Sequence, residues 1–565
     1  MPTRHLIEVA LAAMLAATAC ASSEAGGANI VPGGPSGGTA PGGAGGFSGG
    51  GPAPGNTAGT GGSSGTGGMP LPPETELESS YEVPVATGRF VWIANPTSGR
   101  VAYVDAQSLQ VKTVEAGNAP TFMAAIPSTT DDAVIVLNAL SDDATILRAK
   151  ADTLSSQTVK GLVHGANAWS ISSDGQWAVA WTDATRVKQA TKTQGFQDIA
   201  IINVKAATKA VVAVGYRPAA VAFSSDGKRA FAVTQDGISV VDLTVAAGPT
   251  VSNNFALSDD PSVDADTRDV SITPNGRLAV TRREGSQILG IVDLTTGARA
   301  ALDLGGAITD VDLTTAGDRA VAVLRDQAQV VLVPLAAGVP TIDAVTRVDI
   351  PGQTIGSVTL TADGKNAVLY SNASPAERLV VLSLGAAPTF RVVKLHGAVL
   401  SAFPAPDGAN AVVLHRDVPV PAPVTTGPDG GVAPDAAMPA PTPIAAAAFS
   451  LVPLDGVRPA RLQDTGTPPT AVAIAPASNR ALVTVADEKN QTFAVYLGVF
   501  PSLEVTRFPL ASPPISVGVV AGAGRGFVAQ KHPEGRITFV GLDSGDARTL
   551  TGFELGARVV DWSQP

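Results

Sequence analysis

The stretch VAFSSDGKRAFAVTQDGISVVDL, from Val221 to Leu243, decides how this 565-residue chain folds. It predicts three short strands, separated by a Ser-Asp-Gly turn at Gly227 and an Asp-Gly turn at Gly237. Two-residue Asp-Gly turns favour hairpins because both central positions tolerate a positive φ. The stretch therefore predicts an antiparallel run of strands that ends in Val-Asp-Leu.

The same pattern recurs along most of the chain. It returns as WSISSDGQWAVAWTD from Trp169, VSITPNGRLAVT from Val270, VDLTTAGDRAVAVL from Val311, VTLTADGKNAVLY from Val358 and AFPAPDGANAVVL from Ala402. The turn glycines, 41 to 52 residues apart, are Gly175, Gly227, Gly276, Gly317, Gly364 and Gly408. Weaker copies lie near Asp132, Asn479 and Gly524. This spacing is close to the roughly 40 to 50 residues of one four-stranded propeller blade.

Over residues 86–565 these units resemble the YVTN and WD-repeat-like β-propellers of bacteria, down to third-strand endings such as YVDA, VVDL and IVDL. The resemblance implies an all-β propeller of four-stranded antiparallel blades. It implies little about function, because propellers host many unrelated activities.

Counting a first unit at Gly88 gives ten repeats. Typical propellers have fewer, about four to eight blades. One large ring or two smaller rings would fit this count. We expect the single ring, because the two ends of the repeat region each contain part of one blade. GRFVWIAN from Gly88 begins just after the turn position of a repeat, and the C-terminal ARVVDWSQP stops near that same position, so each end supplies strands that the other lacks. The last strand should pair with the first three strands and close the ring, which protects sheet edges.

Residues 418–448 interrupt the repeats with the sequence VPVPAPVTTGPDGGVAPDAAMPAPTPIAAAA. Proline cannot donate to a strand ladder, so this segment is incompatible with a central strand. We expect a Pro/Ala-rich surface loop inserted between neighbouring strands of one blade.

The N-terminus has the layout of a signal peptide over residues 1–19, with Arg4 and His5 before an apolar stretch. Its end, ATAC from Ala17 to Cys20, resembles the lipobox of bacterial lipoproteins, although Glu8 and Ala17 depart from that pattern. The resemblance implies lipidation of Cys20, the only cysteine, and hence an exported, membrane-anchored protein. Because Ala21 follows the cysteine, the sorting rule of that family favours the outer membrane or the cell surface. An ordinary secretory signal, with Cys20 incidental, is the alternative.

Residues 20–80 are mostly Gly, Ser, Ala, Thr and Pro and predict a disordered tether after the lipidated cysteine. The about 53 residues from Ala21 to Pro73 would have a root-mean-square span of roughly 40 Å as such a coil. The folded part would therefore stand off from the membrane.

The sequence contains no convincing catalytic constellation. Its histidines (His5, His164, His396, His415 and His532) are scattered, without metal-ligand spacing, and we expect them at the surface or in loops. Neither a nucleophile elbow nor a phosphate-binding loop is present, and no catalytic residue or organic cofactor is predicted. The net charge of -11, without a basic cluster, argues against a nucleic-acid partner.

One acidic stretch, LSDDPSVDADTRD, is a candidate calcium site, because Ca²⁺ takes six to eight oxygen ligands. The candidate ligands are Asp259, Asp260, Asp264, Asp266 and Asp269. The stretch lacks the spacing of an EF-hand, and a solvated loop between blades is the favoured interpretation.

Together these features predict a membrane-anchored propeller that acts as a noncatalytic binding or scaffold module for a protein or glycan partner. A narrower form of this hypothesis rests on a resemblance to the propeller lipoprotein of the outer-membrane barrel-assembly machinery. The alternative is a propeller enzyme, such as a lactonase-like hydrolase, whose ligands converge on the central channel from separate blades.

Overall fold

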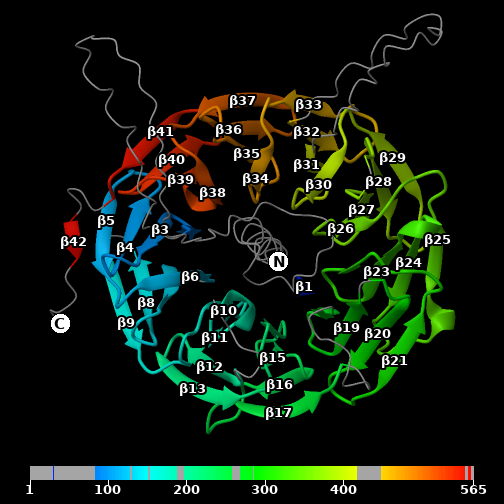
Figure 1. The fold of residues 1–565 in the computed structure, drawn as a ribbon, viewed down its shortest axis with the longest axis horizontal. Helices are drawn as coiled ribbons and strands as arrows, with labels where there is room; N and C mark the ends of the chain where they lie inside the picture. Colours follow the sequence, from blue (N-terminus) through cyan, green and yellow to red (C-terminus); the bar gives the residue numbers. More distant parts are fainter. Residues whose placement is uncertain are drawn as a thin grey trace, which may run out of the picture.

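In a computed structural model, the chain forms a ring of ten blades (Figure 1). The structure describes residues 29–30, 83–127, 130–150, 153–187, 196–257, 268–283, 285–373, 375–415, 447–553 and 558–560. Each blade is an antiparallel sheet whose four strands follow in chain order from the centre of the ring to its perimeter. The predicted single propeller of about ten repeats is confirmed, and the two-ring alternative is wrong.

The first five blades contain strands β2 to β21. Their bounds are, in blade 1, β2 (Val85–Ala86), β3 (Phe90–Asn95), β4 (Arg100–Asp105) and β5 (Val111–Glu115); in blade 2, β6 (Pro120–Ile126), β7 (Asp132–Asn138), β8 (Asp143–Lys150) and β9 (Thr153–Val159); in blade 3, β10 (Ala168–Ile171), β11 (Trp177–Trp181), β12 (Asp198–Asn203) and β13 (Thr208–Ala213); in blade 4, β14 (Ala220–Phe223), β15 (Arg229–Val233), β16 (Ile238–Asp242) and β17 (Thr250–Phe255); in blade 5, β18 (Arg268–Ile272), β19 (Leu278–Arg283), β20 (Ile288–Asp293) and β21 (Arg299–Asp303).

The remaining blades contain strands β22 to β41. Their bounds are, in blade 6, β22 (Asp310–Leu313), β23 (Arg319–Leu324), β24 (Gln329–Pro334) and β25 (Thr346–Asp349); in blade 7, β26 (Ser357–Leu360), β27 (Asn366–Tyr370), β28 (Arg378–Ser383) and β29 (Phe390–Lys394); in blade 8, β30 (Val399–Pro404), β31 (Asn410–His415), β32 (Ala448–Pro453) and β33 (Arg461–Asp464); in blade 9, β34 (Pro469–Ile474), β35 (Arg480–Asp487), β36 (Thr492–Val499) and β37 (Glu504–Pro509); in blade 10, β38 (Pro514–Val520), β39 (Arg525–Gln530), β40 (Arg536–Gly541) and β41 (Ala547–Thr551).

Within the described part of the chain, short 3₁₀ turns occur in four connections. They are η1 (Ala184–Arg186), η3 (Arg325–Gln327), η4 (Ile342–Ala344) and η5 (Ala521–Ala523).

The hydrophobic core is divided among the interfaces between blades. The middle strands of a blade are buried on both faces, as in β11, where all five residues are buried. Ten clusters of buried apolar side chains lie one at each interface of neighbouring blades. The tenth joins the two ends of the propeller, packing Val91 and Ile93 of blade 1 against Phe527 and Phe539 of blade 10. Side-chain packing therefore closes the ring.

Both ends of the described chain add strands to existing blades. The C-terminal β42 (Arg558–Val560) pairs with β5 in parallel, outside blade 1. The last strand thus joins the first blade as expected, but blade 1 already has its own inner strand, β2, which the sequence analysis overlooked. Near the N-terminus, β1 (Asn29–Ile30) pairs antiparallel with the inner edge of β18.

Strand direction divides the connections between two faces of the ring. The turns between the first and second strands of every blade, such as those at Gly227 and Gly276, lie on one face, which we call the turn face. Because the strands alternate in direction, the connections from second to third strand and from one blade to the next lie on the opposite face, which we call the loop face. The strand ends that flank the longest connections, residues 182–197, 256–267 and 416–447, lie on this face.

The chain also enters the ring on the loop face, because β2 is an inner strand that runs toward the turn before β3. The predicted insertion at 418–448 falls mostly outside the described residues. The strands on either side of it, β31 and β32, pair directly, with Leu414 opposite Phe449.

Candidate functional site

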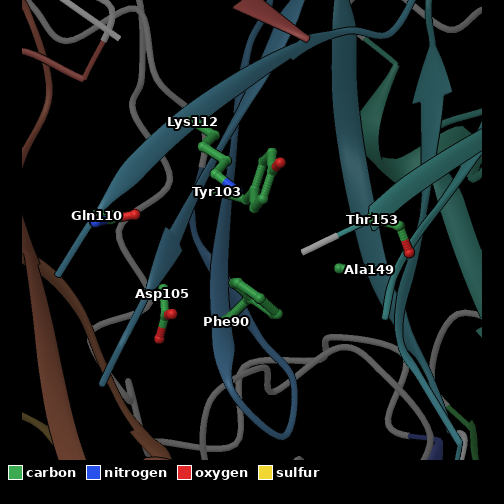
Figure 2. A pocket seen from close by; sticks show the side chains of 7 residues that line it. All are labelled: Phe90, Tyr103, Asp105, Gln110, Lys112, Ala149 and Thr153. Atoms are coloured by element: carbon green, nitrogen blue, oxygen red, sulfur yellow. The ribbon is translucent and has the colours of Figure 1, made fainter. Parts of the chain in front are cut away.

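A depression lies between blades 1 and 2 near the perimeter (Figure 2). It is lined by Phe90, Tyr103, Asp105, Gln110, Lys112, Ala149 and Thr153. Phe90 and Tyr103 are only 6% and 4% exposed, because they pack against each other and against Trp92. Burial raises the pKa of Tyr103 to about 12, so its hydroxyl stays protonated near neutral pH. The buried rings offer a ligand no open stacking surface, and this depression serves the packing of two blades.

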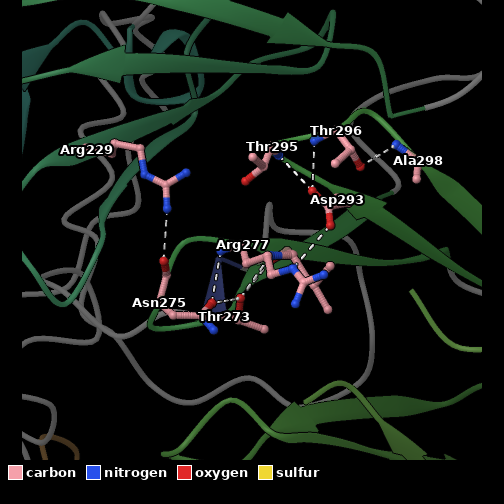
Figure 3. A network of polar contacts seen from close by, with 9 residues as sticks. Arg229, Thr273, Asn275, Arg277, Asp293, Thr295, Thr296 and Ala298 are labelled. Atoms are coloured by element: carbon pink, nitrogen blue, oxygen red, sulfur yellow. Dashed lines mark hydrogen bonds and ion pairs between the residues drawn. The ribbon is translucent and has the colours of Figure 1, made fainter. Parts of the chain in front are cut away.

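The turn face consists of a repeated hydrogen-bonded turn, shown for blade 5 in Figure 3. The Thr273 hydroxyl donates to Asn275 Oδ1 at 2.8 Å, and the same oxygen accepts the backbone N–H of Arg277 at 2.9 Å. Ser224 with Asp226 and Thr361 with Asp363 repeat this arrangement in blades 4 and 7. The polar side chains of these turns are therefore occupied by their own backbone.

The end of the third strand has a second recurring turn on the same face. Asp293 accepts the backbone N–H groups of Thr295 and Thr296 at 2.8 and 2.9 Å, and Arg277 Nε at 3.2 Å (Figure 3). Burial acts to raise the pKa of Asp293, but these hydrogen bonds hold it below the usual value. The aspartate of the Val-Asp-Leu signature thus caps a turn.

Only the glycine of each Ser-Asp-Gly turn needs a positive φ, which is close to +67° from Gly175 to Gly408. The aspartate or asparagine before it does not adopt a positive φ and is held in place by its side chain. Neighbouring turns also bond to each other: the Ser225 N–H donates to Pro274 O at 2.7 Å. The turns of blades 4 and 5 are therefore linked directly.

On the loop face, Asp142 joins two connections in blade 2. Its carboxylate contacts His164 Nδ1 at 2.7 Å and accepts the Gly165 N–H at 3.1 Å. Burial acts to raise the pKa of Asp142, but the hydrogen bonds lower it; the same contact raises the pKa of His164. Nearby, the side chain of Leu140 is 81% exposed. This sector of the loop face presents an ion pair beside an open apolar side chain.

A second polar cluster lies at the loop-face ends of the inner strands of blades 5 to 7. Arg282 forms an ion pair with Asp269 and donates to Thr309 O at 2.6 Å. The Asp310 carboxylate accepts the Val358 N–H at 2.8 Å and so ties blade 6 to blade 7. Burial raises the pKa of Asp310, although the charge of Arg282 partly opposes this. These groups form a chain of interactions across two blade interfaces.

Of the predicted calcium ligands, only Asp269 is described, and its carboxylate is in the ion pair with Arg282. The other four, Asp259, Asp260, Asp264 and Asp266, lie outside the described residues. Within the described part of the chain, no three His, Cys, Asp or Glu side chains are grouped so that they could hold a metal ion.

His415 and Ser450 form a pair that superficially matches a nucleophile and its base. Nε2 of His415 lies 2.7 Å from the Ser450 hydroxyl, and Nδ1 lies 3.3 Å from Ala398 O. Both side chains belong to residues that are 1% exposed, and burial lowers the pKa of His415 to about 4. A substrate could not reach this serine, so the pair holds blade 8 together. The expectation that all histidines lie at the surface or in loops is wrong for His415.

Other blades have a different hydrogen-bonded polar pair at the place that His415 and Ser450 occupy in blade 8, and the sequence-based predictions did not include these pairs. In blade 10, Gln530 donates to Thr538 Oγ1 at 2.7 Å; in blade 2, Asn138 donates to Thr145 Oγ1 at 2.9 Å. In each case the last residue of the second strand meets the third residue of the third strand. A polar residue at the end of these three apolar second strands was the available signal.

The predicted signal peptide, the lipidation site Cys20 and nearly all of the tether lie outside the described residues. Among the helices of the described segments, none is long and apolar enough to cross a membrane.

No family model and no curated protein matches the chain. Solved structures that are similar include hydrazine synthase of Kuenenia stuttgartiensis, at 19% identity and a TM-score of 0.30, over 57% of this chain and 99% of that one. Others are dihydro-heme d1 dehydrogenase NirN in complex with DHE (13%, TM-score 0.39, 78% and 76% coverage) and a eukaryotic initiation factor (11%, 0.42, 76% and 96%). At these identities and scores, no inference about activity is drawn from them.

Proposed function

We propose that the chain is an exported lipoprotein, anchored through Cys20, whose propeller binds a protein or glycan partner at the cell envelope through its loop face. The observation that carries this proposal is the unequal division of connections between the two faces. On the turn face, the turns between first and second strands are short and their polar groups bond to their own backbone; the longest described connection of this face is residues 335–345. The loop face bears the three longest connections.

The position of the N-terminal link supports the same proposal. The chain reaches β2 from the loop face, so a tether joins the ring on the side that carries the long connections. A tether over residues 20–80 would keep a bound partner close to the anchoring membrane. Binding and catalytic groups are typically carried by loops on a rigid scaffold, which is the arrangement of this face.

Affinity capture from intact cells, comparing the full-length protein with Cys20→Ala, tests the proposal. Labelled palmitate should enter the wild type alone, and the wild type should retain a specific protein or glycan in the membrane fraction. The Cys20→Ala form should retain the same molecule from the soluble fraction. Equal palmitate labelling of both forms would contradict the anchor, and capture of nothing above an unrelated propeller would contradict the binding role.

A further inference from the structure

The outer strand of blade 7, β29, presents an unusually apolar edge at the perimeter. Phe390 is 36% exposed and Val392 is 37% exposed, on the same side of the strand. Among the outer strands that the structure describes, only β13 carries another exposed large apolar side chain, Val211. An exposed apolar edge strand is a template for pairing with another chain.

Two other outer edges carry features that hinder such pairing. β17 has a bulge in its pairing with β16, and β37 begins with Glu504 and ends with Pro509. Bulges, charges and proline are the usual protections of edge strands. β29 has neither a bulge nor a proline, and its protection of this kind is the charge of Arg391 and Lys394.

β29 and its neighbour β28 also concentrate positive charge. Arg378 lies directly opposite Lys394 in the pairing of the two strands, and like charges in that position are destabilising. The Nε atom of Arg391 is buried without a hydrogen-bond partner. Among the described residues, none of these three cations is in an ion pair, whereas Arg89, for example, is paired with Asp105. The edge therefore has cationic groups that an acidic partner would neutralise.

Blade 1 shows that an outer strand of this ring accepts a fifth strand, because β42 pairs with β5. We propose that the β29 edge docks an extended acidic segment of a partner protein as a fifth strand of blade 7. Because side chains alternate along a strand, Phe390, Val392 and Lys394 lie on one side of β29 and Arg391 lies on the other. Apolar side chains of the segment would cover Phe390 and Val392, and its carboxylates would lie beside Lys394 on that side and beside Arg391 on the opposite side. This site is separate from the loop face, and neither proposal depends on the other.

Fluorescence anisotropy with the full-length protein tests this docking. The probe is a labelled peptide with the core Val-Glu-Val-Thr-Glu, supplied in both chain directions, together with a version N-methylated along its backbone. The wild type should bind one direction, and Lys394→Glu should weaken that binding roughly tenfold or more, since it replaces attraction by repulsion. Arg461→Glu, the same charge change on the outer strand of blade 8, is the matched control and should leave binding unchanged.

Three outcomes would overturn the proposal. Equal binding by the wild type and Lys394→Glu would remove the role of the edge charges. Equal binding of the N-methylated peptide would exclude strand addition, which needs main-chain hydrogen bonds. A dimer of the free wild-type protein that Lys394→Glu abolishes, measured by sedimentation, would show that the edge serves a second copy of this chain instead.

Discussion

Single glycines of the turn face have two separable roles, backbone conformation and close approach. Gly276 has a φ of +66°, and a Cβ there would lie 2.4 Å from the Phe231 ring of the preceding blade. Gly364 has a φ of +67°, with nothing within 4 Å of its Cβ position. Comparing alanine substitutions at these two glycines therefore separates the two roles.

Gly364→Ala should cost about 1–2 kcal/mol of unfolding free energy, the strain of a left-handed residue. Gly276→Ala should cost a further 1–3 kcal/mol or so, because it also overpacks the interface of blades 4 and 5. Denaturant unfolding of both variants measures the difference. Equal losses of unfolding free energy would mean that the Phe231 side chain moves aside without cost and that the close approach at Gly276 does not contribute to stability.

His415 should make the stability of the fold depend on pH. Its pKa of about 4 lies below the ordinary 6.5, so protonation favours the unfolded chain. The stability that the neutral ring contributes is complete above about pH 6.5 and is lost as the pH falls toward 4, by roughly 3 kcal/mol. His415→Gln should flatten this dependence, since Gln530 fills the same position in blade 10. Thermal melts between pH 7.5 and 4.5 test this, and parallel pH profiles of the two proteins would contradict it.

The turn residues were predictable because Ser, Asp and Gly act within a few positions of one another. The environment of His415 was not, because its partners Ala398 and Ser450 come from the connection before blade 8 and from beyond a long insertion. Asp269 was singled out for its acidic neighbours, yet its ion-pair partner, Arg282, lies on the next strand. Local sequence does not reveal such cross-strand partners.

At the scale of elements, the pairing of β42 with β5 attaches the C-terminal end of the described chain to blade 1. Ending the chain after Phe553 removes its pairing with Lys112, Thr113 and Val114. We expect a lower melting temperature and faster proteolysis near the junction of blades 1 and 10, since the outer edge of β5 is then open. Removing only residues 561–565 is the control. An unchanged melting temperature after the longer truncation would show that side-chain packing alone closes the ring.

Most strands could be predicted from the sequence, because their apolar runs are short and their turns recur at regular spacing. The role of the last strand was predicted only in part. β2 has two residues, too few to show a pattern, so blade 1 seemed to lack a strand that the C-terminus would supply. In the structure the C-terminal strand instead pairs in parallel on the outside.

At the scale of the whole molecule, repeat spacing gave ten units but could not choose between one ring and two. That choice depends on side-chain packing between blades distant in sequence, above all the cluster that joins Val91 and Ile93 to Phe527 and Phe539. Ten interfaces with one apolar cluster each make the ring continuous. The alternating direction of the strands places the turns between first and second strands on one face and the strand ends that flank the longest connections on the other.

Site-specific photo-crosslinking in living cells tests the central claim, that partners bind the loop face, most directly. A photoreactive residue at Leu140, 81% exposed on the loop face, is compared with one at Val457, 85% exposed in a turn-face connection of blade 8. The account predicts a discrete crosslinked partner from position 140 and none from position 457. A partner crosslinked from position 457 alone, or equally from both positions, would contradict it.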